Sequence, residues 1–181
     1  LIIGAGPGLS SSLARLCVSH NMKVVLVSRD IEKLKKLKKE TNVEIISCDC
    51  SNTKNVKELF MKTDKLIGTP NLVVFNAAYR PKRTSIIDLD EEEVQKALQI
   101  NCFGAYLVAR EAAKRMILKK KGSIFFTGAT AGVKGFPNSS AFAIGKFGVR
   151  GLAQSLAREL HPQNIHIAHF VIDGVIAKKP Y

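Results

Sequence analysis

Short apolar runs alternate with longer segments of helical character from one end of the chain to the other. Continuous apolar runs are typical of parallel strands that are buried on both faces. The segments between them are long enough to form helices that cross from one strand to the next. We expect strands over residues 1–4, 23–28, 43–47, 71–76, 122–127 and 165–172, and helices up to about residue 20 and over 30–40, 56–66, 90–118 and 139–160.

This alternation predicts a doubly wound α/β domain, a parallel sheet with helices on both faces. The chain of 181 residues has the length of one domain with a full-sized core. Repeats, low-complexity stretches and linkers are absent from the sequence, so we expect residues 1–181 to form one domain. Leu1 begins inside the first expected strand, and we therefore expect further residues in front of it.

A glycine-rich segment, GAGPGLS over residues 4–10, joins the first strand to the first helix. Glycines at this junction let the chain turn tightly and bring backbone amides against a pyrophosphate. Placed inside a βαβ unit, the segment predicts a dinucleotide site. The residues expected to contact the dinucleotide here are Gly4, Gly6, Pro7, Gly8 and Leu9.

The end of the second strand indicates which dinucleotide binds. A carboxylate there would accept a hydrogen bond from the ribose of NAD, whereas an Arg accommodates the 2′-phosphate of NADP. The sequence has Ser28 and Arg29 at this point, and Asp30 is interpreted as the N-cap of the next helix. We therefore expect NADP or NADPH as the cofactor in preference to NAD.

The net charge is +13, from 28 Lys and Arg against 15 Asp and Glu. Lysines cluster in residues 33–39 and 119–121, on expected helices whose other face is apolar. These clusters lack the interleaved aromatic residues of a nucleic-acid site. We therefore expect neither nucleic acid nor a membrane as partner, although a charge-driven binder of either stays open as the least favoured alternative. The positive field would also attract a polyanionic dinucleotide.

The four cysteines form no CxxC pair and no spaced metal pattern. Cys48 and Cys50 would share one face of a strand, too close along the backbone to pair easily. His166 and His169 would point to opposite faces of the strand expected over residues 165–172, so we expect no metal site. Because no signal peptide or membrane span is visible, we expect reduced thiols in a cytoplasmic protein.

The order of these motifs resembles that of the short-chain dehydrogenases/reductases, over nearly the whole chain. The segments that resemble the family are GAGPGLS at 4–10, CDC at 48–50, FNAA at 75–78, residues 88–104, residues 122–132, and Asp173-Gly174, where the family has Pro-Gly. The resemblance implies a Rossmann fold with strand order 3-2-1-4-5-6. It also implies cofactor contacts from Ser28, Arg29, Asp49, Cys50, Asn76, Ala77, Ala78, Lys146 and Gly174.

The active site implied by the resemblance is altered. Family members use a Tyr, a Lys four residues later, a Ser thirteen residues before the Tyr, and an Asn. Here Asn101 and Lys146 remain, but Phe142 occupies the Tyr position and Ala129 the Ser position. Loss of a general acid typically costs 10²–10⁴ in rate, whereas the cofactor motifs are retained. Cofactor binding is therefore expected to survive where ordinary carbonyl reduction does not.

Three substitutes for the missing groups stay open. Tyr79 could supply a phenol, Thr130 or Ser140 could supply a hydroxyl, or the substrate could be an activated C=C bond that takes its proton on carbon. The resemblance implies an NADP(H)-dependent oxidoreductase that acts on an unidentified small carbonyl, alcohol or activated alkene, in a homodimer or homotetramer built through helices 94–118 and 139–160. The alternative is an NADP-binding pseudoenzyme with a sensing or assembly role. The family's last strand and substrate-covering segment are expected beyond Tyr181.

Overall fold

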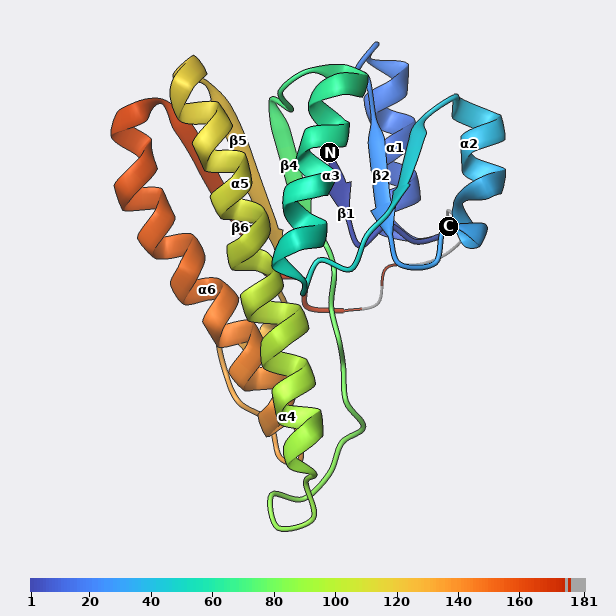
Figure 1. Cartoon of the computed structure of the whole chain (residues 1–181). Helices are drawn as coiled ribbons and strands as arrows, with labels where there is room; N and C mark the ends of the chain where they lie inside the picture. The colour runs from blue at the N-terminus through green and yellow to red at the C-terminus, as the bar shows by residue number, and fades with distance from the viewer. Residues whose placement is uncertain (175, 177–181) are drawn as a thin grey trace.

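The computed structural model describes residues 1–174 and 176, so the end of the expected domain lies outside the described residues. Six parallel strands form one sheet in the order β3-β2-β1-β4-β5-β6 (Figure 1). This order confirms the doubly wound arrangement expected from the sequence. The strands are β1 (Ile2–Ile3), β2 (Val25–Ser28), β3 (Glu44–Ser47), β4 (Leu72–Phe75), β5 (Gly122–Thr127) and β6 (Ile165–Phe170).

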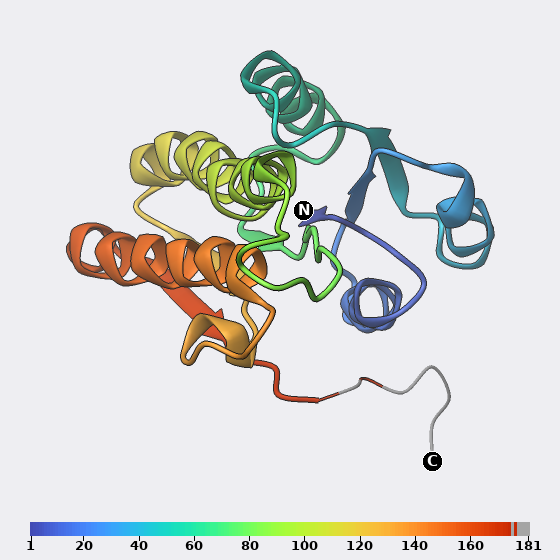
Figure 2. The same cartoon turned by 90° about the horizontal axis from the view of Figure 1, so that it is seen from below.

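Helices pack on both faces of the sheet (Figure 2). One apolar cluster joins the strands to α3, α5 and α6, and a second joins them to α1 and α2 on the other face. Alternate residues of one strand supply both clusters, as Ile2 and Ile3 show. The helices are α1 (Leu9–Ser19), α2 (Lys35–Thr41), α3 (Thr53–Ile67), α4 (Glu91–Ala97), α5 (Gly104–Lys119) and α6 (Ser140–Leu160).

The long helix expected over residues 90–118 is interrupted in the structure. Asp90 caps α4 by accepting a hydrogen bond from the backbone N–H of Glu92 at 2.8 Å. A π-helical segment, Leu98–Phe103, then joins α4 to α5. Such wide turns leave the spacing of apolar residues close to helical, so the sequence pattern does not reveal them.

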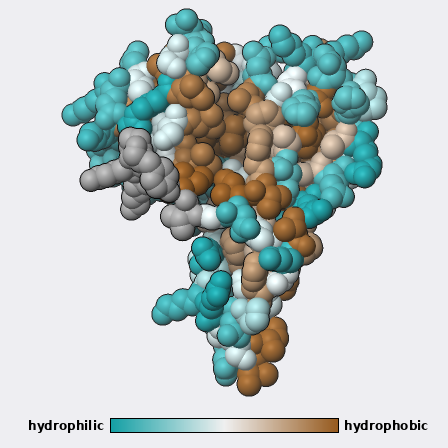
Figure 3. Space-filling model, turned by 180° about the vertical axis from the view of Figure 1, so that it is seen from behind, coloured by the Kyte–Doolittle hydropathy of each residue, from teal (hydrophilic) through white to brown (hydrophobic). Residues whose placement is uncertain are grey.

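On the face of the sheet that carries α1 and α2, part of the apolar surface is not covered by these helices (Figure 3). Phe125 of β5 packs edge-on against Phe170 of β6 with ring centroids 5.3 Å apart, and Phe170 remains 51% exposed. Among the residues described, no helix combines the length and apolar character needed to cross a membrane.

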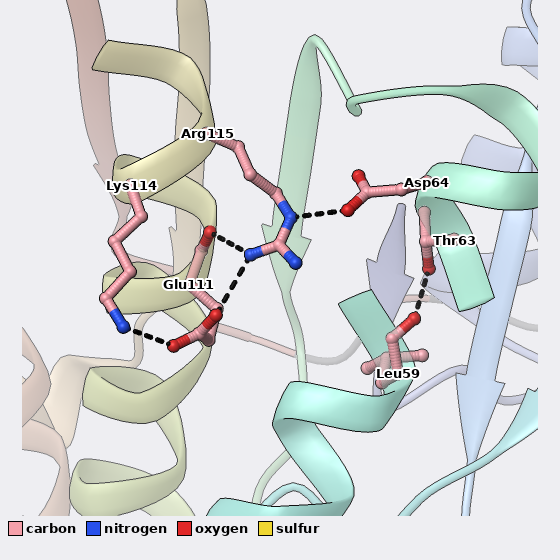
Figure 4. Close-up of polar contacts among 6 residues, drawn as sticks. All are labelled: Leu59, Thr63, Asp64, Glu111, Lys114 and Arg115. Atoms are coloured by element: carbon pink, nitrogen blue, oxygen red, sulfur yellow. Dashed lines mark hydrogen bonds and ion pairs between the residues drawn. The ribbon is translucent and has the colours of Figure 1, made fainter. Parts of the chain in front are cut away.

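An ion-pair network joins α3 to α5 (Figure 4). The guanidinium of Arg115 on α5 donates to Asp64 of α3 at 2.7 Å and to Glu111 one turn earlier at 2.9 Å. Lys114 also donates to Glu111, at 2.8 Å. Although burial opposes its charge, Glu111 has a pKa below the ordinary value because Lys114 and Arg115 hydrogen-bond to it. The network therefore connects α3 to α5 on the same face of the sheet.

Candidate functional site

The carboxyl ends of β1 to β4 meet around a cleft of about 230 Å³. Ligands of open α/β sheets bind at this edge, where the strand order reverses between β1 and β4. The cleft contains eight of the residues predicted to bind cofactor: Gly4, Ser28, Arg29, Asp49, Cys50, Asn76, Ala77 and Ala78. Lys33, Cys48, Ser51 and Ile100 complete its lining.

Gly4 lies where no other residue fits. Its φ of +74° is left-handed, and a Cβ at this position would lie 2.3 Å from the backbone N and Cα of Ala77. The side-chain amide of Asn76 donates to the Gly4 carbonyl at 3.3 Å and to the Ser10 hydroxyl at 2.9 Å. The glycine segment is therefore held directly against the end of β4.

The remainder of the glycine segment has open space in front of it. A Cβ on Gly6 or Gly8 would meet no heavy atom within 4 Å. Gly8 is the N-cap of α1 and contributes no side chain to its first amides, while Pro7 is exposed and Leu9 begins the helix. This combination of free amides at a helix N-terminus and unfilled space fits the pyrophosphate of a dinucleotide.

Arg29 extends from the end of β2 at the rim of the cleft and is exposed. The Asp30 carboxylate accepts a hydrogen bond from the backbone N–H of Glu32 at 3.0 Å, the local capping contact expected of it. The cations of Arg29 and Lys33 both line the cleft. Lys33 was not predicted as a cleft residue, although a cation four residues after Arg29 was a usable signal.

The Asp49 carboxylate of the CDC segment is held in place by a neighbouring residue. The Asp49 carboxylate accepts hydrogen bonds from the hydroxyl of Ser51 at 2.7 Å and from its backbone N–H at 3.0 Å. The bonds from Ser51 and the charge of Arg29 keep the Asp49 pKa below its ordinary value. Asp49 therefore offers a fixed, ionised acceptor inside the cleft.

Two positions that the sequence interpretation placed in the active site, 142 and 146, lie near the next strand end, that of β5. Lys146 of α6 is 4% exposed and donates a hydrogen bond to the carbonyl of Thr127 at 3.0 Å. Burial lowers the pKa of Lys146 to about 8. The Phe142 ring lies one turn earlier on the same helix face, with its centroid 5.7 Å from the Lys146 Nζ and 5.6 Å from the Arg80 Cζ.

The Tyr79 phenol is engaged away from Lys146. It donates to the Glu93 carboxylate of α4 at 2.7–2.8 Å, and this hydrogen bond raises the Tyr79 pKa. The buried Asn101 side chain fixes the Tyr79 backbone, accepting from its N–H at 2.6 Å and donating to its carbonyl at 2.9 Å. The π-helical segment thus places Asn101 where it anchors the loop after β4.

Ala129 follows β5 as the N-cap of a 3₁₀ turn, Thr130–Gly132, and offers only a methyl group. The neighbouring Thr130 hydroxyl donates to the Asp173 carboxylate. Gly174 follows with a φ of +146°, after the end of β6. Lys146 and Gly174 are thus separate from the lining of the cleft at β1 to β4.

Two small residues of α6 accommodate a neighbour from the same chain. A Cβ on Gly145 would lie 2.9 Å from the Asn101 amide, and one on Gly148 would lie 2.6 Å from the Cys102 sulfur. The π-helical segment of the same chain therefore occupies the space beside these two glycines.

A family model described as short chain dehydrogenase matches residues 1–177. The chain is 30% identical over 169 residues to the 3-oxoacyl-[acyl-carrier-protein] reductase FabG of Rickettsia prowazekii. The aligned region covers 92% of this chain and 68% of that protein. A similar solved structure is a short-chain dehydrogenase from Rhodopseudomonas palustris, at 32% identity and a TM-score of 0.87, with 96% of this chain and 84% of that one covered.

Two further similar structures hold a nicotinamide cofactor. One is a Tyr-to-Phe variant of ElxO with NADPH bound, at 25% identity and a TM-score of 0.89, covering 95% of this chain and 72% of that one. The other is NAD⁺-bound xylitol dehydrogenase, at 26% identity and a TM-score of 0.89, covering 95% and 68%. With the matching family model, the sheet order and the cleft, these similarities show that the chain belongs to the short-chain dehydrogenase/reductase family of oxidoreductases.

Proposed function

We propose that the protein binds NADP(H) in the cleft at β1 to β4 and transfers hydride to or from a small carbonyl, alcohol or activated alkene through an altered active site. The cleft carries this proposal, because it gathers eight predicted cofactor residues from four segments of the chain. The cofactor would supply the hydride, and the chain's own residues would bind and orient it.

Arg29 and Lys33 support the choice of NADP(H) over NAD(H). Both cations line the cleft, and the adjoining Ser28 brings no carboxylate that would repel a 2′-phosphate. The ElxO variant with NADPH and xylitol dehydrogenase with NAD⁺ show that proteins of this fold take either dinucleotide. The charge at the end of β2 is therefore the feature on which the preference depends.

The proposed roles at the active site follow from the groups that remain. Lys146 would donate hydrogen bonds to the ribose hydroxyls of the bound cofactor, and Asn101 would hold the loop around it. Phe142 presents a bare ring where the family has its proton donor, so the proton would come from water or a hydroxyl such as that of Thr130 or Ser140, or be added on carbon. A Tyr-to-Phe variant of ElxO holds NADPH, which supports cofactor binding without that phenol.

The same two positions favour a second candidate, an NADP-binding pseudoenzyme. Phe142 and Ala129 remove both the general acid and an oxyanion donor, the second of which alone is worth about 10²–10³ in rate. The two costs are not additive because the groups act as a unit. A protein that binds cofactor but turns over no substrate would act as a sensor or as an assembly factor.

The fluorescence of bound NADPH tests the proposal directly. We expect the wild-type protein to bind NADPH at least tenfold more tightly than NADH, and Arg29→Ala to lose most of this difference, about 1.5 kcal/mol for a charge-assisted contact. Lys39→Ala is the matched control, since Lys39 is an exposed cation of α2 outside the cleft. Preference for NADH, or equal losses in both variants, would contradict the assignment.

The oligomeric state is also a proposal. Large apolar side chains on the outer faces of the long helices are 38–45% exposed: Leu98, Phe103, Tyr106, Ile144 and Phe147. We propose that these faces pair in a homodimer or homotetramer. Light scattering would show the oligomer, and we expect the Phe147→Glu variant to be a monomer.

The location of the protein is a proposal too. The four free thiols support a reducing, cytoplasmic location.

A further inference from the structure

Two cysteine thiols lie side by side in the wall of the cofactor cleft. Cys48 and Cys50 both line the cleft next to Arg29, and each is less than 10% exposed. Their sulfur atoms are 3.9 Å apart, with the Cys50 thiol directed as donor toward the Cys48 sulfur. The other two cysteines, Cys17 and Cys102, lie outside this cleft.

The backbone between the two thiols is not part of a strand. β3 ends at Ser47, and a turn closed by a 3.2 Å hydrogen bond from the Asn52 N–H to the Asp49 carbonyl follows. In a regular strand, residues 48 and 50 would be held apart by the extended backbone. The turn begins at Asp49, between the two thiols, and their sulfur atoms lie 3.9 Å apart despite the short spacing along the chain.

The two thiols are not equivalent. The hydrogen bond donated by Cys50 lowers the pKa of the Cys48 thiol, and the same bond raises the pKa of the Cys50 thiol. Thiolate character makes a cysteine the attacking partner in thiol–disulfide exchange. Cys48 therefore has the character of the attacking thiol and Cys50 that of the resolving one.

We propose that Cys48 and Cys50 form a reversible disulfide, and that this disulfide and a bound dinucleotide exclude one another. The inference rests on the proposed function, because it assigns the cleft to NADP(H). The thiols are reached from the cleft, so a dinucleotide lying there covers them. Joining the sulfur atoms also requires them to approach by about 1.9 Å to the S–S bond length, which displaces the wall around Asp49.

The oxidant is a small disulfide such as glutathione disulfide. The Cys48 thiolate attacks one of its sulfurs, the S–S bond of the oxidant breaks, and one glutathione leaves as a thiolate that takes a proton from water. Cys50 then loses its proton to water and attacks the Cys48 sulfur, which releases the second glutathione. Two protein thiols are oxidised to one disulfide, and one glutathione disulfide is reduced to two thiols.

Mass spectrometry on a Cys17→Ser/Cys102→Ser background tests the proposal, since only the pair then reacts. We expect glutathione disulfide to remove two hydrogens from the protein and the Cys50→Ser variant to stop at a glutathione adduct. NADP⁺ serves as the protecting ligand because it cannot donate electrons. At about 100 times its Kd it leaves about 1% of the clefts free, so oxidation should slow about 100-fold.

The binding of NADP⁺ to the oxidised protein completes the test. We expect the affinity of the protein with both thiols for NADP⁺ to fall at least tenfold on oxidation and to return on reduction. In Cys48→Ser/Cys50→Ser the affinity, whatever its starting value, should be the same before and after the treatment. A pair that stays reduced, or that oxidises equally fast with and without NADP⁺, would overturn the inference. If the reduced protein does not bind NADP⁺ at all, the proposed function fails, and the mass change then reports the disulfide separately.

Discussion

Alanine substitutions at two glycines of the segment over residues 4–10 should have different effects: one should lower stability and the other should weaken cofactor binding. In Gly4→Ala, the new Cβ would lie 2.3 Å from backbone atoms of Ala77, which cannot move as a flexible side chain would. The φ of +74° adds a second penalty. Together, left-handed backbone at roughly 1–2 kcal/mol and overpacking at roughly 1–3 kcal/mol predict a loss of about 2–5 kcal/mol in the free energy of unfolding.

Gly6→Ala is the matched variant. Its Cβ would meet no heavy atom within 4 Å, and its φ lies outside the left-handed range. We expect urea unfolding to change by less than about 1 kcal/mol, while NADPH affinity falls at least tenfold because the methyl group occupies space assigned to the pyrophosphate. Equal destabilisation by the two substitutions, or unchanged NADPH affinity in Gly6→Ala, would refute this assignment of the two glycines.

Two further predictions concern buried charge. Arg115→Met should lower the free energy of unfolding by about 2 kcal/mol, less than for a fully buried pair because water partly screens the network, whereas Lys114→Met, half-exposed, should cost under about 1 kcal/mol. Urea titrations that rank the two variants the other way would contradict the network. Because burial lowers the Lys146 pKa to about 8, the native state loses this proton before the unfolded state does as pH rises. Stability should therefore rise by roughly 3 kcal/mol between pH 8 and 10.5 in wild type relative to Lys146→Met, and parallel pH profiles would exclude the buried ammonium.

The fold was predictable because the strands of a parallel sheet have a recognisable sequence pattern. Strands buried on both faces appear as continuous apolar runs, and the segments between them can only cross from strand to strand. The glycine at position 4 was equally predictable, since the junction of strand and helix requires a tight turn. The candidate cofactor cleft follows from topology, because the segments predicted to line it lie at the carboxyl ends of β1 to β4.

The contacts made by individual side chains were less predictable. Tyr79 follows β4 as expected, yet its phenol pairs with Glu93, fourteen residues later. Thr130 and Asp173 depend in the same way on a contact between distant segments. Gly145 showed only that something approaches α6 closely. That the neighbour belongs to the same chain depends on the π-helical turn, which local spacing does not encode.

Reduction of aldehydes and diketones by the wild type and by Phe142→Tyr/Ala129→Ser, followed as NADPH oxidation, bears most directly on the altered active site. Lys146 and the cleft are already present, so under the proposed function the double substitution adds only the two polar groups that the family resemblance implies. We predict a rate at least 100-fold above that of the wild type, in line with the worth of a general acid, at an unchanged Kd for NADPH. A wild-type protein that reduces these carbonyls as fast as the double variant would contradict the account.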